Sequence, residues 1–325
     1  MSRLKTPLSD ALDIEVPLIC GAMYPCSNPE LIAAVSEAGG IGIVQPISLT
    51  YVHGHEFRAG LRHIRTLTDR PIGFNALVEK SSKVYEERMR QWIDVALEED
   101  IRFFVTALGN PRWVVDKVHA AGGIVYHDVV NRKWAEKALS EGVDGLICVN
   151  SEAGGHAGST HPRRLYEELA DLGVPLVCAG GIGDEADFVA ALEMGYAGVQ
   201  MGTRFIATTE CTAHADYKEA IVGAKADDIV LTEKISGVAV AVIKTPYIER
   251  VGTKAGWLAK RMLRHRKLKH YMRLFYTLKS LWQLKRASLQ GMNYKDFFQA
   301  GRSVSGVAAV ESAGDVVKRF ADAAR

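Results

Sequence analysis

The stretch PLVCAGGIGDEADFVAALEMGYAGVQMGTRF (175–205) decides the fold. It contains an apolar run, a glycine-rich turn, a helix-like segment, a second apolar run and a second glycine turn. The runs PLVCAGG (175–181) and AGVQMG (197–202) are short and continuous, which is typical of strands buried on both faces. Because the helix-like segment Asp184–Met194 separates them, the two strands are expected to run parallel.

Such apolar runs recur about every 25 to 30 residues, in the βα rhythm of a parallel sheet. Eight are present: VPLICGA (16–22), GIGIVQ (40–45), PIGFNAL (71–77), RFFVTAL (102–108), GIVYHDV (123–129), GLICVN (145–150), PLVCAGG (175–181) and AGVQMG (197–202). The helix-like segments between them include Asn28–Ala38, Lys83–Glu99, Asn131–Ser140, Pro162–Leu172 and Asp184–Met194. Eight units predict an α/β fold, a TIM-type (β/α)8 barrel. A doubly wound open sheet is the alternative, because periodicity does not show closure.

The strand–helix pattern breaks after Ala224, so we expect a barrel domain over 1–224 and a different unit over 225–295. Residues from about 226 to 291 read as helices with apolar residues at helical spacing, which predicts a C-terminal helical cap or small domain. The cap is basic: between Lys244 and Lys295 there are fourteen Lys and Arg against the single acidic Glu249. A terminal helical segment, 296–325, is expected to return to the barrel.

Several classes of protein are disfavoured by composition. The five cysteines are scattered, without the paired spacing of a zinc site or a redox dithiol, and no set of His, Cys and Asp has metal-ligand spacing. The N-terminus lacks a signal-peptide core and no apolar run is long enough to span a membrane. We therefore predict a cytoplasmic protein without a metal or a transmembrane segment. Nothing resembles a nucleic-acid-binding fold.

Two glycine turns indicate a phosphate site. In barrels of this type the loops after the strands build the active site, and phosphate commonly binds after strands seven and eight. AGGIG (179–183) follows the seventh predicted strand and MGTR (201–204) follows the eighth, so bare backbone N–H groups could approach phosphate oxygens there. The other interpretation is a pair of ordinary tight turns.

The stretch SEAGGHAGST (151–160) places one histidine among glycines after the sixth run. Together with GAM (21–23), AVSEAGGIG (34–42), GFN (73–75), AGGIGD (179–184) and VQMGTRFIATTEC (199–211), it resembles an FMN-dependent family. That family holds nitronate monooxygenases (2-nitropropane dioxygenases), a bacterial NADH:quinone reductase and the flavin-type enoyl-ACP reductases. The resemblance covers Val16 to Cys211, with a weaker echo in FFQAGRSVSGV (297–307).

The resemblance implies a cofactor, FMN, and a set of site residues. Ala22 and Met23 would pass under the flavin, and Asn75 would bond its ring. The resemblance also assigns Gly155 and Ala179 to the cofactor. The FMN phosphate would be held by Gly180, Gly181, Gly202 and Thr203. The family's histidine falls on His156, a catalytic residue whose near-neutral pKa suits proton transfer beside the flavin. The other interpretation is that His156 only bonds loop backbone.

One position departs from the family. Some relatives carry a lysine at the end of strand five, near the electron-rich edge of the flavin, where this chain has Tyr126-His127-Asp128. His127 could supply a hydrogen-bond donor to the cofactor there. A buried histidine bonded to Asp128 is the alternative.

Several functions stay open at this point. An acyl-thioester oxidoreductase would move a hydride between flavin and a carbon next to the thioester carbonyl, as a dehydrogenase or an enoyl reductase. The basic cap would then bind CoA phosphates through Arg261, Arg264, Arg266 and Lys267, and it resembles members that act on CoA thioesters of steroid-ring fragments. The alternatives are a nitronate monooxygenase for small nitroalkanes, an NAD(P)H:quinone reductase, and a non-catalytic flavin-binding protein docking on a membrane. NAD(P)H is a candidate transient electron donor, and the basic run could also be a solvated helical face.

Overall fold

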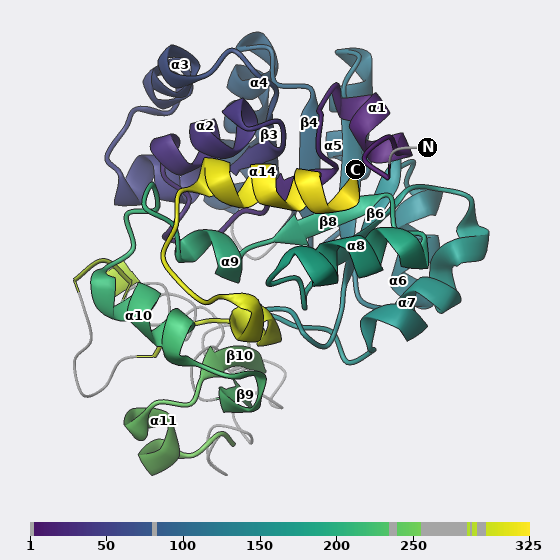
Figure 1. Cartoon of the computed structure of the whole chain (residues 1–325). Helices are drawn as coiled ribbons and strands as arrows, with labels where there is room; N and C mark the ends of the chain where they lie inside the picture. Colours follow the sequence, from purple (N-terminus) through teal and green to yellow (C-terminus); the bar gives the residue numbers. More distant parts are fainter. Residues whose placement is uncertain (1–2, 80–82, 234–238, 255–284, 287, 291–296) are drawn as a thin grey trace, which may run out of the picture.

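The computed structural model describes residues 3–79, 83–233, 239–254, 285–286, 288–290 and 297–325. Its centre is a closed barrel of eight parallel strands in chain order (Figure 1). The strands are β1 (Leu18–Cys20), β2 (Ile41–Val44), β3 (Ile72–Leu77), β4 (Phe103–Ala107), β5 (Ile124–Val129), β6 (Gly145–Val149), β7 (Leu176–Ala179) and β8 (Gly198–Met201). β1 pairs with both β2 and β8, which closes the sheet. The predicted TIM-type barrel is confirmed.

The described helices are α1 (Pro7–Leu12), α2 (Pro29–Glu37), α3 (Phe57–Leu67), α4 (Lys83–Glu98), α5 (Arg112–Ala120), α6 (Arg132–Ser140), α7 (Pro162–Leu169), α8 (Glu185–Met194), α9 (Thr203–Ile206), α10 (Ala215–Gly223), α11 (Pro246–Val251) and α14 (Ala313–Ala324). Most of them cover the outside of the barrel (Figure 1). The described residues also form a short π-helix, η1 (Ser48–Val52), and three 3-10 helices, η2 (Ala170–Leu172), η3 (Ala226–Asp228) and η4 (Arg302–Gly306).

Each strand buries both of its faces. On β5 the ring of Tyr126 packs with Val105 and Ile147 inside the barrel, whereas Val125 and Val129 belong to the layer between the barrel and its helices. Burying such a side chain stabilises the fold by about 1.5 to 3 kcal/mol. The helix α1 joins the interior layer through Leu8 and Leu12. The interior is therefore packed, and chemistry is left to the loops at one end.

Local sequence sets the helix ends. The α8 helix begins with a capping box, in which the Asp184 side chain accepts a hydrogen bond from the Asp187 N–H at 3.0 Å and the Asp187 side chain bonds back. It ends at Gly195, whose φ of 109° lies in the left-handed region that glycine tolerates. The long stretch quoted first therefore folds as strand, helix and strand, as predicted.

The segment after Ala224 differs from the prediction. Helices were expected from about 226 to 291, but the chain forms two antiparallel strands, β9 (Ile229–Thr232) and β10 (Val240–Ile243). The helical interpretation was wrong there, because IVLT and VAVI are β-branched runs that favour extended chain. Figure 1 shows this hairpin and α11 beside α10. The basic residues Arg261, Arg264, Arg266 and Lys267 lie outside the described residues.

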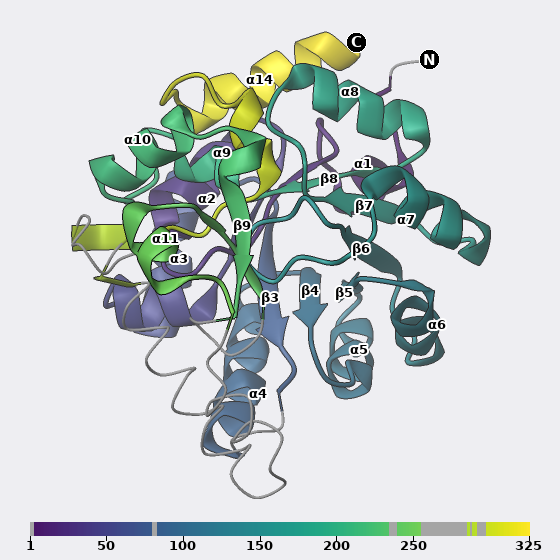
Figure 2. The same cartoon turned by 90° about the horizontal axis from the view of Figure 1, so that it is seen from below.

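The end of the chain lies against the barrel. The α14 helix packs against α8 and α2, and Figures 1 and 2 both show it running alongside α8. Its buried face includes Val316, Val317 and Phe320, and the Phe320 ring contacts Phe188 of α8 with ring centroids 5.6 Å apart. Among the helices of the described residues, none is long and apolar enough to cross a membrane.

Candidate active site

The turn after β7 requires glycine. Gly180 and Gly181 have φ angles of 117° and 86°, which residues with a side chain rarely adopt. A Cβ atom on Gly180 would lie 2.4 Å from Asn150 Oδ1 and 2.5 Å from the Ala153 nitrogen. The turn after β7 therefore sits directly against the loop that follows β6.

Four backbone N–H groups at these turns have no acceptor within the described part of the chain: those of Gly181, Ile182, Gly202 and Thr203. Ile182 and Thr203 are each only 7% exposed. Nearly all buried N–H groups in proteins are paired, so a cluster of unpaired donors at neighbouring strand ends fits an anion. A phosphate group supplies the oxygens that such donors bind.

The loop after β6 folds back on itself and carries His156. Buried Asn150 anchors it: its Nδ2 donates to the Gly180 carbonyl at 2.9 Å, and its own carbonyl accepts from the Gly158 N–H at 3.0 Å. Gly155, at φ 66°, accepts from the Ala241 N–H of β10 at 2.7 Å. The hairpin that the sequence analysis missed therefore supports the glycines on which His156 depends.

His156 lies exposed near the tip of this loop. Protein around the ring still desolvates it, which lowers its pKa below the usual value. At neutral pH the ring is therefore mostly neutral and able to accept a proton. No described residue hydrogen-bonds the ring, so the alternative of a histidine that only bonds loop backbone finds no support in this part of the chain.

The loop after β1 carries Ala22 and Met23, both half-buried. The Gly21 N–H donates to the Met201 carbonyl of β8 at 2.9 Å, and the Met23 N–H donates to Ser27 Oγ at 2.8 Å. A Cβ atom on Gly202 would lie 3.4 Å from Met23 Sδ. The fold therefore brings this loop next to the turn after β8, as a shared ligand would need.

Asn75 faces the barrel interior on β3. A Cβ atom on Gly73, two residues earlier on the same face, would meet the interior side chains Ile43 and Phe103. Phe74 lies on the opposite face, in the layer next to the helices. Asn75 is 8% exposed, so its amide is a buried polar group that faces the interior.

The geometry speaks against His127 as a cofactor residue. His127 lies between Val125 and Val129 in the alternation of β5, on the face toward the helices, and its Nδ1 is 2.8 Å from Thr106 Oγ1. Burial lowers its pKa to about 4, so it is neutral. The alternative bond to Asp128 is also absent, because Asp128 lies on the opposite face with Tyr126. Sequence analysis missed Asp128 as the inward residue.

The segment 297–307 completes the site from the far end of the chain. The Gly301 N–H donates to Thr203 Oγ1 at 3.0 Å, and a Cβ atom on Gly154 would lie 2.9 Å from the Gly301 nitrogen. A Cβ atom on Gly183, in the turn after β7, would lie even closer to the Ser303 carbonyl oxygen. The only sequence signal for this was the weak echo in FFQAGRSVSGV.

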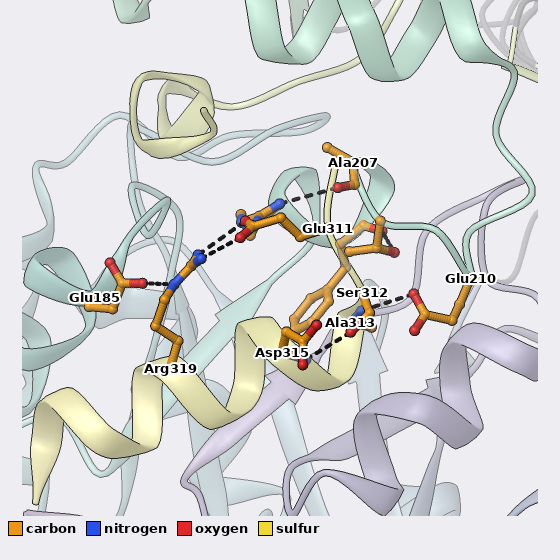
Figure 3. A network of polar contacts seen from close by, with 11 residues as sticks. Glu185, Ala207, Glu210, Glu311, Ser312, Ala313, Asp315 and Arg319 are labelled. Carbon is orange, nitrogen blue, oxygen red and sulfur yellow. Dashed lines mark hydrogen bonds and ion pairs between the residues drawn. The ribbon is translucent and has the colours of Figure 1, made fainter. Parts of the chain in front are cut away.

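An ion-pair network holds the part of the chain that follows this segment (Figure 3). Arg204, 1% exposed, pairs with Glu311, which also pairs with Arg319 of α14, and Arg319 pairs with Glu185 of α8. Hydrogen bonding to Arg319 and the charge of Arg204 lower the pKa of Glu311. Arg204 directly follows Thr203, so the network ties the turn after β8 to the C-terminal part of the chain.

A closed parallel barrel with glycine turns after β7 and β8 and a histidine-bearing loop at the same end has the architecture on which TIM-barrel enzymes build their active sites. Residues 5–322 match the family model described as nitronate monooxygenase. The chain belongs to this family and is an oxidoreductase. Members of the family are flavin enzymes.

Relatives within the family differ in what their names say they act on. One from Rhodococcus jostii, 31% identical over 80% of this chain and 72% of its own length, is named (3aS,4S,5R,7aS)-5-hydroxy-7a-methyl-1-oxo-octahydro-1H-indene-4-carboxyl-CoA dehydrogenase. Another from Pseudomonas aeruginosa, 32% identical over 70% of this chain and 76% of its own length, is named nitronate monooxygenase. The solved structure of FabK from Thermotoga maritima superposes with a TM-score of 0.79 at 28% identity, covering 98% of this chain and 96% of that one.

Proposed function

We propose that the chain is an FMN-dependent oxidoreductase that moves a hydride between the flavin and a carbon of an acyl-CoA thioester. The observation that carries the proposal is the cluster of unpaired N–H groups at Gly181, Ile182, Gly202 and Thr203, which fits the single phosphate of FMN. The name of the Rhodococcus relative supports the substrate class.

Bound FMN would supply the hydride chemistry. The chain's own residues would bind, orient and move protons. The turns after β7 and β8 would hold the phosphate, Asn75 would offer its buried amide to the ring, and the loop with Ala22 and Met23 would pass beneath it. Neutral His156 would accept the proton that leaves the substrate when the hydride goes to the flavin, because its lowered pKa leaves it unprotonated near neutral pH. In the reverse direction the protonated ring would return that proton.

The first experiment identifies the cofactor and the substrate. Heat-released chromophore should chromatograph as FMN, and FAD or no flavin would overturn the proposal. The purified flavoprotein is then mixed anaerobically with acyl-CoAs, NADH, NADPH or nitroalkanes while the flavin absorbance is followed. We expect an acyl-CoA to change the flavin absorbance. If NADH or NADPH reduces the flavin, that nucleotide is the electron donor.

The basic segment tests the CoA assignment. Neutral replacements of Arg261, Arg264, Arg266 and Lys267 should each weaken acyl-CoA binding by about 1 to 3 kcal/mol, less where salt screens the contact. The KM for acyl-CoA should rise with ionic strength, while activity on an uncharged nitroalkane should not change. A KM that responds to neither change would contradict the CoA assignment.

Nitronate oxidation is the second candidate, favoured by the Pseudomonas relative. It would use the same His156 as a base toward a small nitroalkane. Rapid reduction of the flavin by nitroalkanes, without any response to acyl-CoAs, would replace the first proposal with this one.

A further inference from the structure

Asp128 is an inward-facing carboxyl near the carboxyl end of β5. It shares the interior face with Tyr126, and its register partner on β6 is Ile147, which is also in the interior layer. Because Thr106 is the register partner of His127, the neighbour of Asp128 on β4 is Ala107. The carboxyl therefore lies at the end of the barrel where the four unpaired N–H groups also lie.

No described group neutralises this carboxyl. The residue as a whole is half-buried, yet its Oδ1 is buried and has no hydrogen-bond partner among the described residues. His127 on the same strand faces the helices and bonds Thr106. The titratable neighbour on β6 is the buried Cys148, whose pKa is raised by burial and in small part by Asp128 itself. Burial raises the pKa of Asp128 to about 7.

A buried carboxyl without a partner is unfavourable unless it is protonated or meets a ligand. In its neutral form it donates an O–H hydrogen bond, and in its ionised form it repels negative charge. A flavin ring carries acceptor atoms and gains one negative charge when it takes up a hydride. A carboxyl beside it would therefore bind its proton more tightly after reduction.

We propose that Asp128 sets the reduction potential of the flavin by exchanging a proton with solvent as the flavin changes its oxidation state. The inference rests on the proposed function. Two electrons and one proton enter the flavin from the donor. Above neutral pH a second proton passes from water to the Asp128 carboxylate, so that its charge does not oppose the charge on the reduced flavin.

The test measures the midpoint potential of bound flavin from about pH 6 to about pH 9, with dithionite as reductant and an indicator dye at equilibrium. Wild type is compared with Asp128→Asn, a neutral isostere, and with Asp69→Asn, a matched charge change at an exposed position ahead of β3. Above neutral pH the equilibrium constant for reduction of the flavin should fall tenfold more per pH unit in wild type than in Asp128→Asn. For two electrons this is an extra fall of about 30 mV in the midpoint potential per pH unit. Asp69→Asn should follow wild type.

Equal pH slopes for wild type and Asp128→Asn would overturn the inference while leaving the FMN assignment intact. A slope changed equally by Asp69→Asn would overturn it too, because the effect would then be general electrostatics. If the wild-type protein holds no flavin, the proposed function fails first, and the chromatography of the released chromophore shows this separately.

Discussion

The protonation state of Asp128 can be tested without any cofactor, by measuring how the stability of the protein depends on pH. Burial raises the pKa of this carboxyl from 3.8 to about 7. A raised folded-state pKa means that the folded chain holds the proton more tightly than the unfolded chain. The resulting stabilisation is fully present below the unfolded pKa and is lost as the pH rises through the folded pKa.

The magnitude follows from the size of the shift. A shift of about three units corresponds to about 4 kcal/mol at most, at 1.36 kcal/mol per unit. Most of it falls within an accessible range: between about pH 5 and about pH 8 the group should lose about 2 to 3 kcal/mol of stabilising free energy. Asp128→Asn has no carboxyl to titrate at this position, so its unfolding free energy should lack this pH-dependent contribution.

Urea unfolding of apoprotein at several pH values checks the prediction. The difference in unfolding free energy between wild type and Asp128→Asn should fall by about 2 to 3 kcal/mol from about pH 5 to about pH 8. Asp69→Asn serves as the control, because the exposed Asp69 should change stability little over this range. A difference that stays constant to within about 0.5 kcal/mol would refute a neutral Asp128 in the folded state.

Three other perturbations test the site. His156→Ala should keep FMN bound but slow flavin reduction by substrate about 10²-fold or more, as stopped-flow absorbance would show, and unchanged rates would make His156 dispensable. Gly180→Ala should abolish FMN retention, because its Cβ atom would meet Asn150 and Ala153, whereas Gly173→Ala, with a φ of 72° and open space around it, should retain FMN at a cost of about 1 kcal/mol. Glu311→Gln should lower the unfolding free energy by about 2 kcal/mol, because it leaves buried Arg204 without its carboxylate; a loss below about 0.5 kcal/mol, as for an exposed pair, would contradict this account.

The apolar runs alone fixed the position of all eight barrel strands, and the glycine turns alone indicated where an anion would bind. Both are local signals: a strand buried on both faces is continuously apolar, and a turn in the left-handed region favours glycine, as at Gly180 and Gly181. The motifs around His156 likewise pointed to the family before any contact was known.

Because each strand is continuously apolar, the sequence does not show which of its faces points into the barrel. On β5, Tyr126, His127 and Asp128 are all wholly or partly buried, so the sequence shows no alternation to separate the interior from the helix side. Only barrel closure assigned His127 to Thr106 and left Asp128 Oδ1 without a hydrogen-bond partner among the described residues.

Long-range contacts were equally invisible in the sequence. The hydrogen bond from Gly301 to Thr203 joins positions 98 residues apart, and the pair Arg204–Glu311 joins positions 107 apart. Periodicity reports only on neighbours along one helix or strand. The sequence by itself therefore determined the barrel and its likeness to a flavin family. The tertiary structure decided which residues face the interior and how the chain's end completes the site, because both depend on closing the sheet and packing distant segments against it.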